Sequence, residues 1–237
     1  MNAFALNPPI GCFGGTFNPP HVAHLALVHA ACLQLQLAQV LMIPAGQPWQ
    51  KPQVLPAHHR VKMLEAALEY DKSLWQSQLT NQNTPYPLQL DPLEANLSES
   101  SYTITTLKTL RQRYPKTPLV WIMGSDQLSN LHTWRDWQDL LNYAHIAVAQ
   151  RANHHVAPAE LIDPIRQLYA ERVTNDPTQW QGTLCGHFIP FTLPALQISS
   201  SAIRAELQRG TDPDQMSTLP PTVAHYISTH HLYQDIL

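Results

Sequence analysis

Short apolar runs alternate along this chain with longer segments of helical pattern, and this alternation limits the fold more than any other feature. The runs that favour β-strands cover residues 10–13, 39–43, 119–123 and 145–149, with a weaker candidate at 188–189. The helical patterns cover 21–37, 57–70, 103–113, 201–209 and 221–229. Strands separated by helices of this length need crossover connections, which favour a parallel sheet. The sequence therefore predicts an α/β fold with a doubly wound, mainly parallel sheet and helices on both faces.

The length of the chain suits one well-buried core and is short for two independent ones. Its 237 residues are 44% apolar, as expected of a globular protein. We therefore expect a single domain over residues 1–237, with a small C-terminal helical portion from about residue 198.

Charged residues are scarce, at 13% of the chain, and the formal net charge is -3. Proteins that grip nucleic acid nonspecifically carry a basic excess, because Lys and Arg neutralise the phosphates. Nucleic acid is therefore not an expected partner. The three cysteines are too scattered for a disulfide framework or a zinc cluster. No apolar run approaches the ~18–20 residues that span a bilayer, so we expect a cytoplasmic protein with no membrane partner; an oligomer stays open.

A glycine pair at the end of the first strand begins the first candidate ligand site, which reads GGTFNPPHVAH from Gly14 to His24. Glycine lets the backbone approach a ligand closely, because no side chain stands in the way. The start of the following helix offers free N–H groups and a positive dipole end to an anion. His21 and His24 are three residues apart, so they share one face of the first helical turn. Backbone amides beside two imidazoles favour a polyphosphate ligand.

Other interpretations of this segment compete with the polyphosphate site. The segment lacks the Gly-Lys-Ser/Thr of a P-loop, and its glycine spacing differs from the dinucleotide-binding fingerprint. Taken separately, the glycine pair fits an ordinary tight turn, and one histidine at a helix start fits a surface or capping residue. A metal site on His21 and His24 lacks an apparent third ligand.

A second motif, ISSSAIR at residues 198–204, stands before another helical segment. Hydroxyls at a helix start cap the backbone and can donate to phosphate oxygens. Arg204 adds a permanent positive charge and a planar fork of donors. Taken alone, a serine-rich helix start is more often a structural cap.

Together, these two motifs resemble the (H/T)xGH and ISSTxIR signatures of the nucleotidyltransferase superfamily. The chain departs from the signatures at Ala23, where Gly is usual, at Ser201, which replaces Thr, and at Asn18, where many members carry Asp. The resemblance implies a Rossmann-like fold that binds ATP. The ATP-binding residues that it implies are Gly14, Gly15, Thr16, Phe17, Gly124, Asp126, Ile198, Ser199 and Ser200.

Further segments resemble the nicotinate-nucleotide adenylyltransferases within that superfamily. They are SYTITTL at 101–107, GSDQL at 124–128 and WRDW at 134–137, with RVKML at 60–64 after a proline-rich loop that contains Lys51. The resemblance runs from about residue 10 to residue 230. It implies acceptor-binding roles for Tyr102, Thr103, Trp134 and Arg135.

The resemblance implies transfer of the adenylyl group of ATP to nicotinate mononucleotide, with release of pyrophosphate. The attacking phosphate is already an anion, so the protein needs only to position both substrates and stabilise negative charge. The catalytic residues implied are His21 and His24 for the α- and β-phosphates, and Arg204 and Lys51 for the leaving pyrophosphate. Mg²⁺ is expected with ATP, held mainly by substrate oxygens and water and not by a metal site of the protein.

Three alternatives stay open from the sequence. The acceptor could be nicotinamide mononucleotide or another phosphorylated compound. A noncatalytic nucleotide sensor that kept the fold would bind ATP without releasing pyrophosphate. A zinc protein would use the histidine pairs at 58–59, 154–155 and 230–231.

Overall fold

The structure, a computed structural model, describes residues 6–47, 54–78, 85–97, 100–151, 161–193 and 196–234. Its strands are β1 (Ile10–Gly15), β2 (Gln39–Pro44), β3 (Leu88–Leu90), β4 (Leu119–Gly124), β5 (His145–Arg151) and β6 (Phe188–Leu193). Its α-helices are α1 (Val22–Leu35), α2 (Ala57–Gln78), α3 (Thr103–Arg113), α4 (Ser125–Ser129), α5 (Asp163–Arg172), α6 (Pro177–Trp180), α7 (Ser200–Gln208) and α8 (Pro221–Thr229). Short 3₁₀ helices are η1 (Leu131–Thr133), η2 (Trp137–Asn142) and η4 (Pro213–Gln215).

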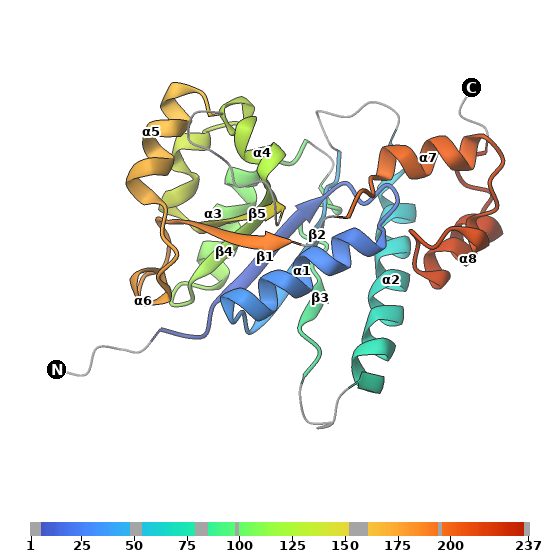
Figure 1. The fold of residues 1–237 in the computed structure, drawn as a ribbon, viewed down its shortest axis with the longest axis horizontal. Coiled ribbons are helices and arrows are strands. Elements are labelled where there is room, and N and C mark those ends of the chain that lie inside the picture. Colours follow the sequence, from blue (N-terminus) through green and yellow to red (C-terminus); the bar gives the residue numbers. More distant parts are fainter. Residues whose placement is uncertain are drawn as a thin grey trace. The chain divides into compact units, whose positions relative to one another are not determined.

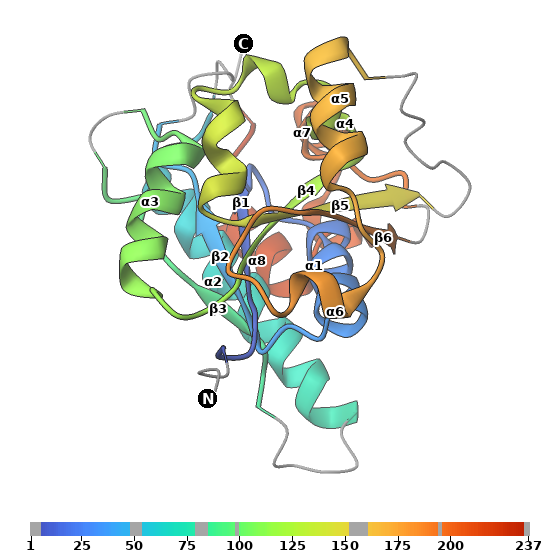
Figure 2. The ribbon, with the colours of Figure 1, turned by 90° about the vertical axis from the view of Figure 1, so that its left-hand side faces the viewer.

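The described strands form a six-stranded sheet in the order β3-β2-β1-β4-β5-β6. β1 pairs with β4, β4 with β5 and β5 with β6, each in parallel, and Figure 2 shows β4, β5 and β6 as neighbours. The strand order reverses between β1 and β4, because the chain runs outward from β1 to β3 and then returns to start again at β4. Ligands of such sheets bind beyond the carboxyl ends of the strands at this switch point. The predicted α/β fold with a mainly parallel sheet is confirmed.

The burial of the longer strands explains why the sequence predicts them. Five of the six residues of β4 are buried, and so is the apolar part of β2. A strand covered on both faces reads as one continuous apolar run. No such pattern in the sequence marks β3, which has three residues, the short helices α4 and α6, or α5, whose buried side chains are Ile165 and Tyr169.

The chain forms two compact units, each with its own internal packing. Unit 1 comprises residues 1–14, 27–41 and 101–195, and unit 2 comprises residues 15–26, 42–100 and 196–237. The expectation of a single domain with a C-terminal helical portion stays a prediction.

In unit 1, a single arginine ties the start of the central strands together. Arg111 on α3 donates hydrogen bonds to the carbonyls of Tyr114, Thr117, Tyr143 and Leu184, over 2.7–3.2 Å. Burial lowers the pKa of this guanidinium. Because the usual pKa of arginine is very high, the group stays charged. Four loop carbonyls therefore share one cationic donor.

In unit 2, α8 packs against α2, and Figure 1 shows the two helices side by side. Their contact is the centre of an apolar core that also takes side chains from α7 and the C-terminal turn, namely Met63, Ala67, Ile203, Leu207, Met216, Leu219, Val223, Ala224, Ile227, Leu232 and Tyr233. The C-terminal segment is thus part of the core of this unit.

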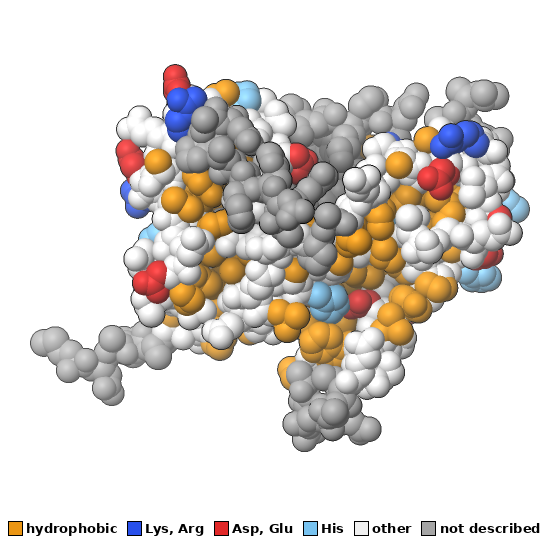
Figure 3. Space-filling model, viewed as in Figure 1, with side chains coloured by type: hydrophobic (Ala, Val, Ile, Leu, Met, Phe, Trp, Pro, Cys, Tyr) orange, Lys and Arg blue, Asp and Glu red, His pale blue; other side chains and the backbone are white. Residues whose placement is uncertain are grey.

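The distribution of charge on the surface and the character of the helices agree with the composition. On the face drawn in Figure 3, the described Lys and Arg side chains are few and scattered. Among the helices that the structure describes, none is long and apolar enough to cross a membrane.

Candidate active site

The loop from β1 to α1 holds the first motif, and internal packing explains its glycines. A Cβ atom at Gly14 would lie 2.6 Å from the Trp121 ring, and one at Gly15 would lie 2.9 Å from the Phe17 ring. A larger residue at either position would displace these rings. Phe17 is 1% exposed and has a left-handed backbone, with φ of 49°. The loop, including the half-buried Thr16, therefore turns tightly around a buried aromatic side chain.

His21 and His24 lie at the start of α1 with their rings stacked. The ring centroids are 3.7 Å apart and the ring planes differ by 23°. The backbone N–H of His21 donates to Nδ1 of His24 over 3.2 Å. A neutral His24 therefore carries its proton on Nε2, where it can donate to a ligand oxygen.

Burial makes His21 a neutral donor or acceptor at pH 7. The residue is 5% exposed, and desolvation lowers the pKa of its imidazole from 6.5 to about 4. Nδ1 of His21 is buried and has no hydrogen-bond partner among the described residues. Buried polar atoms are rarely left in this state, so a polar ligand atom is a natural partner.

The second motif forms the start of α7. Ser199 is the N-cap, and its Oγ accepts a hydrogen bond from the backbone N–H of Ala202 over 3.2 Å. Ile198 is half-buried and packs against the apolar core of unit 2. The structural interpretation of these two residues, as a cap and a packing contact, therefore holds whatever else they do.

The two motifs touch each other directly within unit 2. Oγ of Ser200 donates to the carbonyl of Pro19 over 3.0 Å, across a sequence separation of 181 residues. Nη1 of Arg204 donates to the carbonyl of Asn18 over 2.8 Å. The start of α7 is thereby held against the loop that leads to His21. The Arg204 guanidinium is thus held beside the segment that precedes the His21 imidazole, an arrangement suited to phosphate oxygens.

A third segment is attached to this loop by Arg60 of α2, which is 1% exposed. Its guanidinium donates to the carbonyls of Leu55, Thr16 and Gly46 over 2.9, 2.8 and 2.6 Å. The two loops that follow β1 and β2 are therefore joined through one side chain. Lys51, which the sequence assigns to the second of these loops, lies outside the described residues.

At the carboxyl end of β4, Gly124 and Asp126 lie as the sequence suggests. A Cβ atom at Gly124 would meet Oδ1 of Asp126, so a larger residue there would displace this exposed carboxylate. Asp126 is exposed in the first turn of α4 and accepts a hydrogen bond from Nε2 of Gln127 over 2.9 Å. An exposed carboxylate at this end of a parallel strand suits hydrogen bonds to ligand hydroxyls.

The residues assigned to the acceptor also lie in unit 1. Tyr102 is the N-cap of α3, has no side-chain capping bond, and leads directly into Thr103. The guanidinium of Arg135 lies over the Tyr102 ring, 4.9 Å from its centroid. Trp134, the preceding residue, is half-buried. A helix start with an arginine stacked above it attracts a small anion.

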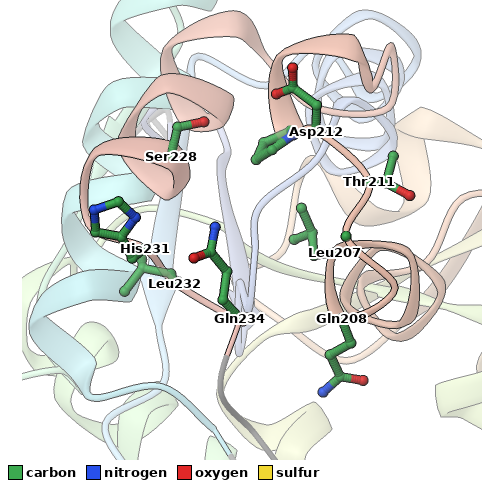
Figure 4. A pocket seen from close by; sticks show the side chains of 10 residues that line it. Leu207, Gln208, Thr211, Asp212, Ser228, His231, Leu232 and Gln234 are labelled. Atoms are coloured by element: carbon green, nitrogen blue, oxygen red, sulfur yellow. The ribbon is translucent and has the colours of Figure 1, made fainter.

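A separate hollow of about 540 Å³ lies in the C-terminal part of unit 2, as Figure 4 shows. Its lining comes from α7, η4, α8 and the turn after α8, and includes Asp212, His231 and Gln234. The site residues that the sequence suggests do not line it.

Comparison with known proteins agrees with both motifs. A family model described as cytidylyltransferase-like matches residues 12–206. A protein of Pseudoalteromonas atlantica named probable nicotinate-nucleotide adenylyltransferase is 36% identical, with 97% of this chain and 96% of that protein covered. A protein of the same name from Herminiimonas arsenicoxydans is 35% identical, with 95% and 97% covered. This chain belongs to the nicotinate-nucleotide adenylyltransferase family.

Solved structures show the fold of this adenylyltransferase family member independently. The nicotinic acid mononucleotide adenylyltransferase of Plasmodium falciparum, complexed with NaAD, has a TM-score of 0.69 to this chain. The two are 19% identical, and the match covers 96% of this chain and 98% of the other.

Three residues that hold the site of this adenylyltransferase together were not assigned to it from the sequence. They are Asn18, which accepts hydrogen bonds from Arg204 and Tyr233, Arg60, which joins two loops, and Tyr233. The hydroxyl of Tyr233 donates to Oδ1 of Asn18 over 2.8 Å, across 215 residues. The RVKML segment drew attention to Arg60 without showing what it binds. No local pattern marks a tyrosine near the C-terminus as a partner of the first motif.

Proposed function

We propose that this protein transfers the adenylyl group of ATP to nicotinate mononucleotide, which yields nicotinate adenine dinucleotide and pyrophosphate. The observation that carries the proposal is the direct contact between the two motifs, where Ser200 and Arg204 bond to the backbone of Pro19 and Asn18. This contact joins two segments from opposite ends of the chain that both carry proposed phosphate donors, which supports an adenylyl transfer.

In the proposed reaction, a phosphate oxygen of the acceptor attacks the α-phosphorus of ATP. The bond from that phosphorus to the oxygen bridging to the β-phosphate breaks, and pyrophosphate leaves. His24, through Nε2, and His21 donate to the phosphate oxygens on which negative charge grows. Arg204 uses Nη1 to hold Asn18, and its other N–H groups can donate to the departing pyrophosphate. Lys51 is proposed as a second cation for that group.

Mg²⁺ enters the proposed reaction as the complex with ATP. No group of three or more His, Cys, Asp or Glu side chains within the described ranges could hold a metal ion. We propose that phosphate oxygens and water hold the ion, which would neutralise the charge of the triphosphate.

The anionic acceptor is favoured over its amide by the charge around Tyr102. The first N–H groups of a helix have no partner within the helix, and the positive end of the helix dipole lies there. Arg135 adds a cation beside that end. Both features stabilise a carboxylate more than a neutral carboxamide, so the start of α3 is the proposed binding place for the nicotinate carboxylate, with Trp134 beside the ring.

The test is pyrophosphate release with MgATP and either nicotinate or nicotinamide mononucleotide at equal concentrations. The acid should react severalfold faster or more. Arg135→Met should lower the ratio of the rate with the acid to the rate with the amide. Arg172→Met, which removes an exposed arginine of α5, should leave this ratio unchanged. Equal rates with wild-type protein would refute the carboxylate assignment. ATP binding without pyrophosphate release from either acceptor would favour the sensor instead.

A further inference from the structure

The C-terminal turn reaches back to the first motif through a buried hydrogen bond. The hydroxyl of Tyr233 and Oδ1 of Asn18 are 2.8 Å apart. Tyr233 is 2% exposed and Asn18 is 3% exposed, so water does not compete freely for either group. A buried hydrogen bond of this kind costs more to break than a surface bond, because water cannot replace the lost partner of either group.

The backbone around Tyr233 is shaped to hold its side chain inward. His231 and Tyr233 both have a left-handed backbone, with φ of 51° and 67°. Such conformations are costly for bulky residues and persist where the surroundings determine them. Here the N–H of Leu232 bonds to the carbonyl of Ile227, and Leu232 and Tyr233 both pack in the core of unit 2. The tyrosine ring is therefore fixed independently of its hydroxyl.

Asn18 receives a second bond that links it to the proposed chemistry. Its carbonyl accepts Nη1 of Arg204, while its side chain accepts the hydroxyl of Tyr233. It lies between Phe17, whose backbone is left-handed, and the Pro19 carbonyl that binds Ser200. A shift of Asn18 would move both the guanidinium and the approach to His21.

We propose that Tyr233 is a positioning residue of the phosphate site, whose hydroxyl fixes Asn18 and thereby the loop that carries His21 and the contact to Arg204. The role rests on the proposed function, because it concerns the same phosphate site. Burial raises the pKa of Tyr233, against the opposing effect of Arg204 and Arg60, so the phenol remains a protonated donor.

The test compares Tyr233→Phe with Tyr226→Phe. The first removes only the hydroxyl that binds Asn18, while the second removes a hydroxyl of α8 that bonds to His59. Tyr233→Phe should lower kcat for pyrophosphate release about tenfold, as expected for one lost buried bond. The KM for nicotinate mononucleotide should stay within twofold. Tyr226→Phe should leave both constants unchanged.

A second variant guards against a simple folding defect. Asn18→Ala removes the acceptor and leaves the tyrosine ring in place, and its kcat should fall at least as far. Because both substitutions break the same bond, the double variant should be no slower than Asn18→Ala alone. Additive losses, a Tyr233→Phe kcat within twofold of wild type, or equal losses in Tyr226→Phe would overturn the proposal.

Binding of a nonhydrolysable ATP analogue, followed by tryptophan fluorescence, separates this proposal from the proposed function. If wild-type protein shows no turnover, the proposed function fails, and affinity for the analogue then decides the positioning role. Weaker binding by Tyr233→Phe than by Tyr226→Phe, at a temperature where both are folded, supports the role. Equal binding by the two variants refutes it.

Discussion

His24 is the residue whose proposed role depends most directly on a single atom. Its Nδ1 accepts the His21 N–H, which leaves Nε2–H as the donor toward phosphate. Loss of a donor to developing charge typically lowers kcat by roughly 10²–10³. We expect a fall of that order for His24→Ala and a smaller one for His24→Gln, which keeps an amide donor. Steady-state kinetics with the exposed His58→Ala as control would check this; near-normal turnover of His24→Ala would exclude the role.

His145 offers a test of electrostatics away from the proposed chemistry. It is fully buried, its Nδ1 accepts the N–H of His187, and its Nε2 bonds to the carbonyl of Thr183. This arrangement requires the neutral ring with its proton on Nε2. Desolvation is the main cause that lowers the pKa of His145 from 6.5 to about 4.

In the unfolded chain, His145 therefore binds a proton below about pH 6.5, whereas in the folded protein it binds one only below about pH 4. Its contribution to stability is complete above pH 6.5 and is lost as the pH falls through that window. Between pH 6.5 and 5, the free energy of unfolding should drop by roughly 2 kcal/mol from this group. Urea unfolding of wild type and His145→Gln at pH 7 and pH 5 measures it. An identical pH dependence in both proteins would contradict the assignment.

At the scale of elements, Arg60 joins α2 to the loops after β1 and β2. A lysine at this position keeps the charge but lacks the fork that serves three carbonyls. A buried carbonyl left without a donor costs about 1–3 kcal/mol; the bond to Gly46 is buried, and the bonds to Leu55 and Thr16 are partly buried. We expect Arg60→Lys to lower the free energy of unfolding by roughly 2–4 kcal/mol in urea titrations.

Lys62, two residues further along α2, provides the matched comparison. It is exposed and pairs with Glu65 one helical turn away. A solvent-exposed ion pair contributes little to stability, so Lys62→Met should unfold close to wild type. If Arg60→Lys were as stable as Lys62→Met, the three carbonyl bonds would not be what holds these loops.

At the scale of the whole molecule, metal dependence separates catalysis from folding. We propose that Mg²⁺ acts with ATP in catalysis and not in folding; no group of three metal ligands occurs among the described residues. Treatment with EDTA should abolish pyrophosphate release. The midpoint of thermal unfolding should change by no more than about 1 °C, because only an ion bound to the folded protein would stabilise it. Added Mg²⁺ should restore turnover. A large fall in the midpoint would instead reveal a structural metal site.

The sequence alone was sufficient for the class of fold and for the family, because both depend on local patterns. Apolar runs mark β4 and β5 since these strands are buried on both faces. The motifs at 14–24 and 198–204 are readable since glycines, prolines and caps act on neighbouring backbone. By contrast, the three-residue β3 has no period to detect.

Only the tertiary structure decided which residues from distant segments meet. Tyr233 reaches Asn18 across 215 residues, and Arg204 reaches the same residue across 186. Arg60 is buried and donates to three carbonyls, contacts that the RVKML segment does not encode. Likewise, the neutrality of His21 follows from burial and not from its neighbours in sequence. Desolvation and long-range hydrogen bonds depend on what the fold places around a group, and no local pattern of residues encodes that environment.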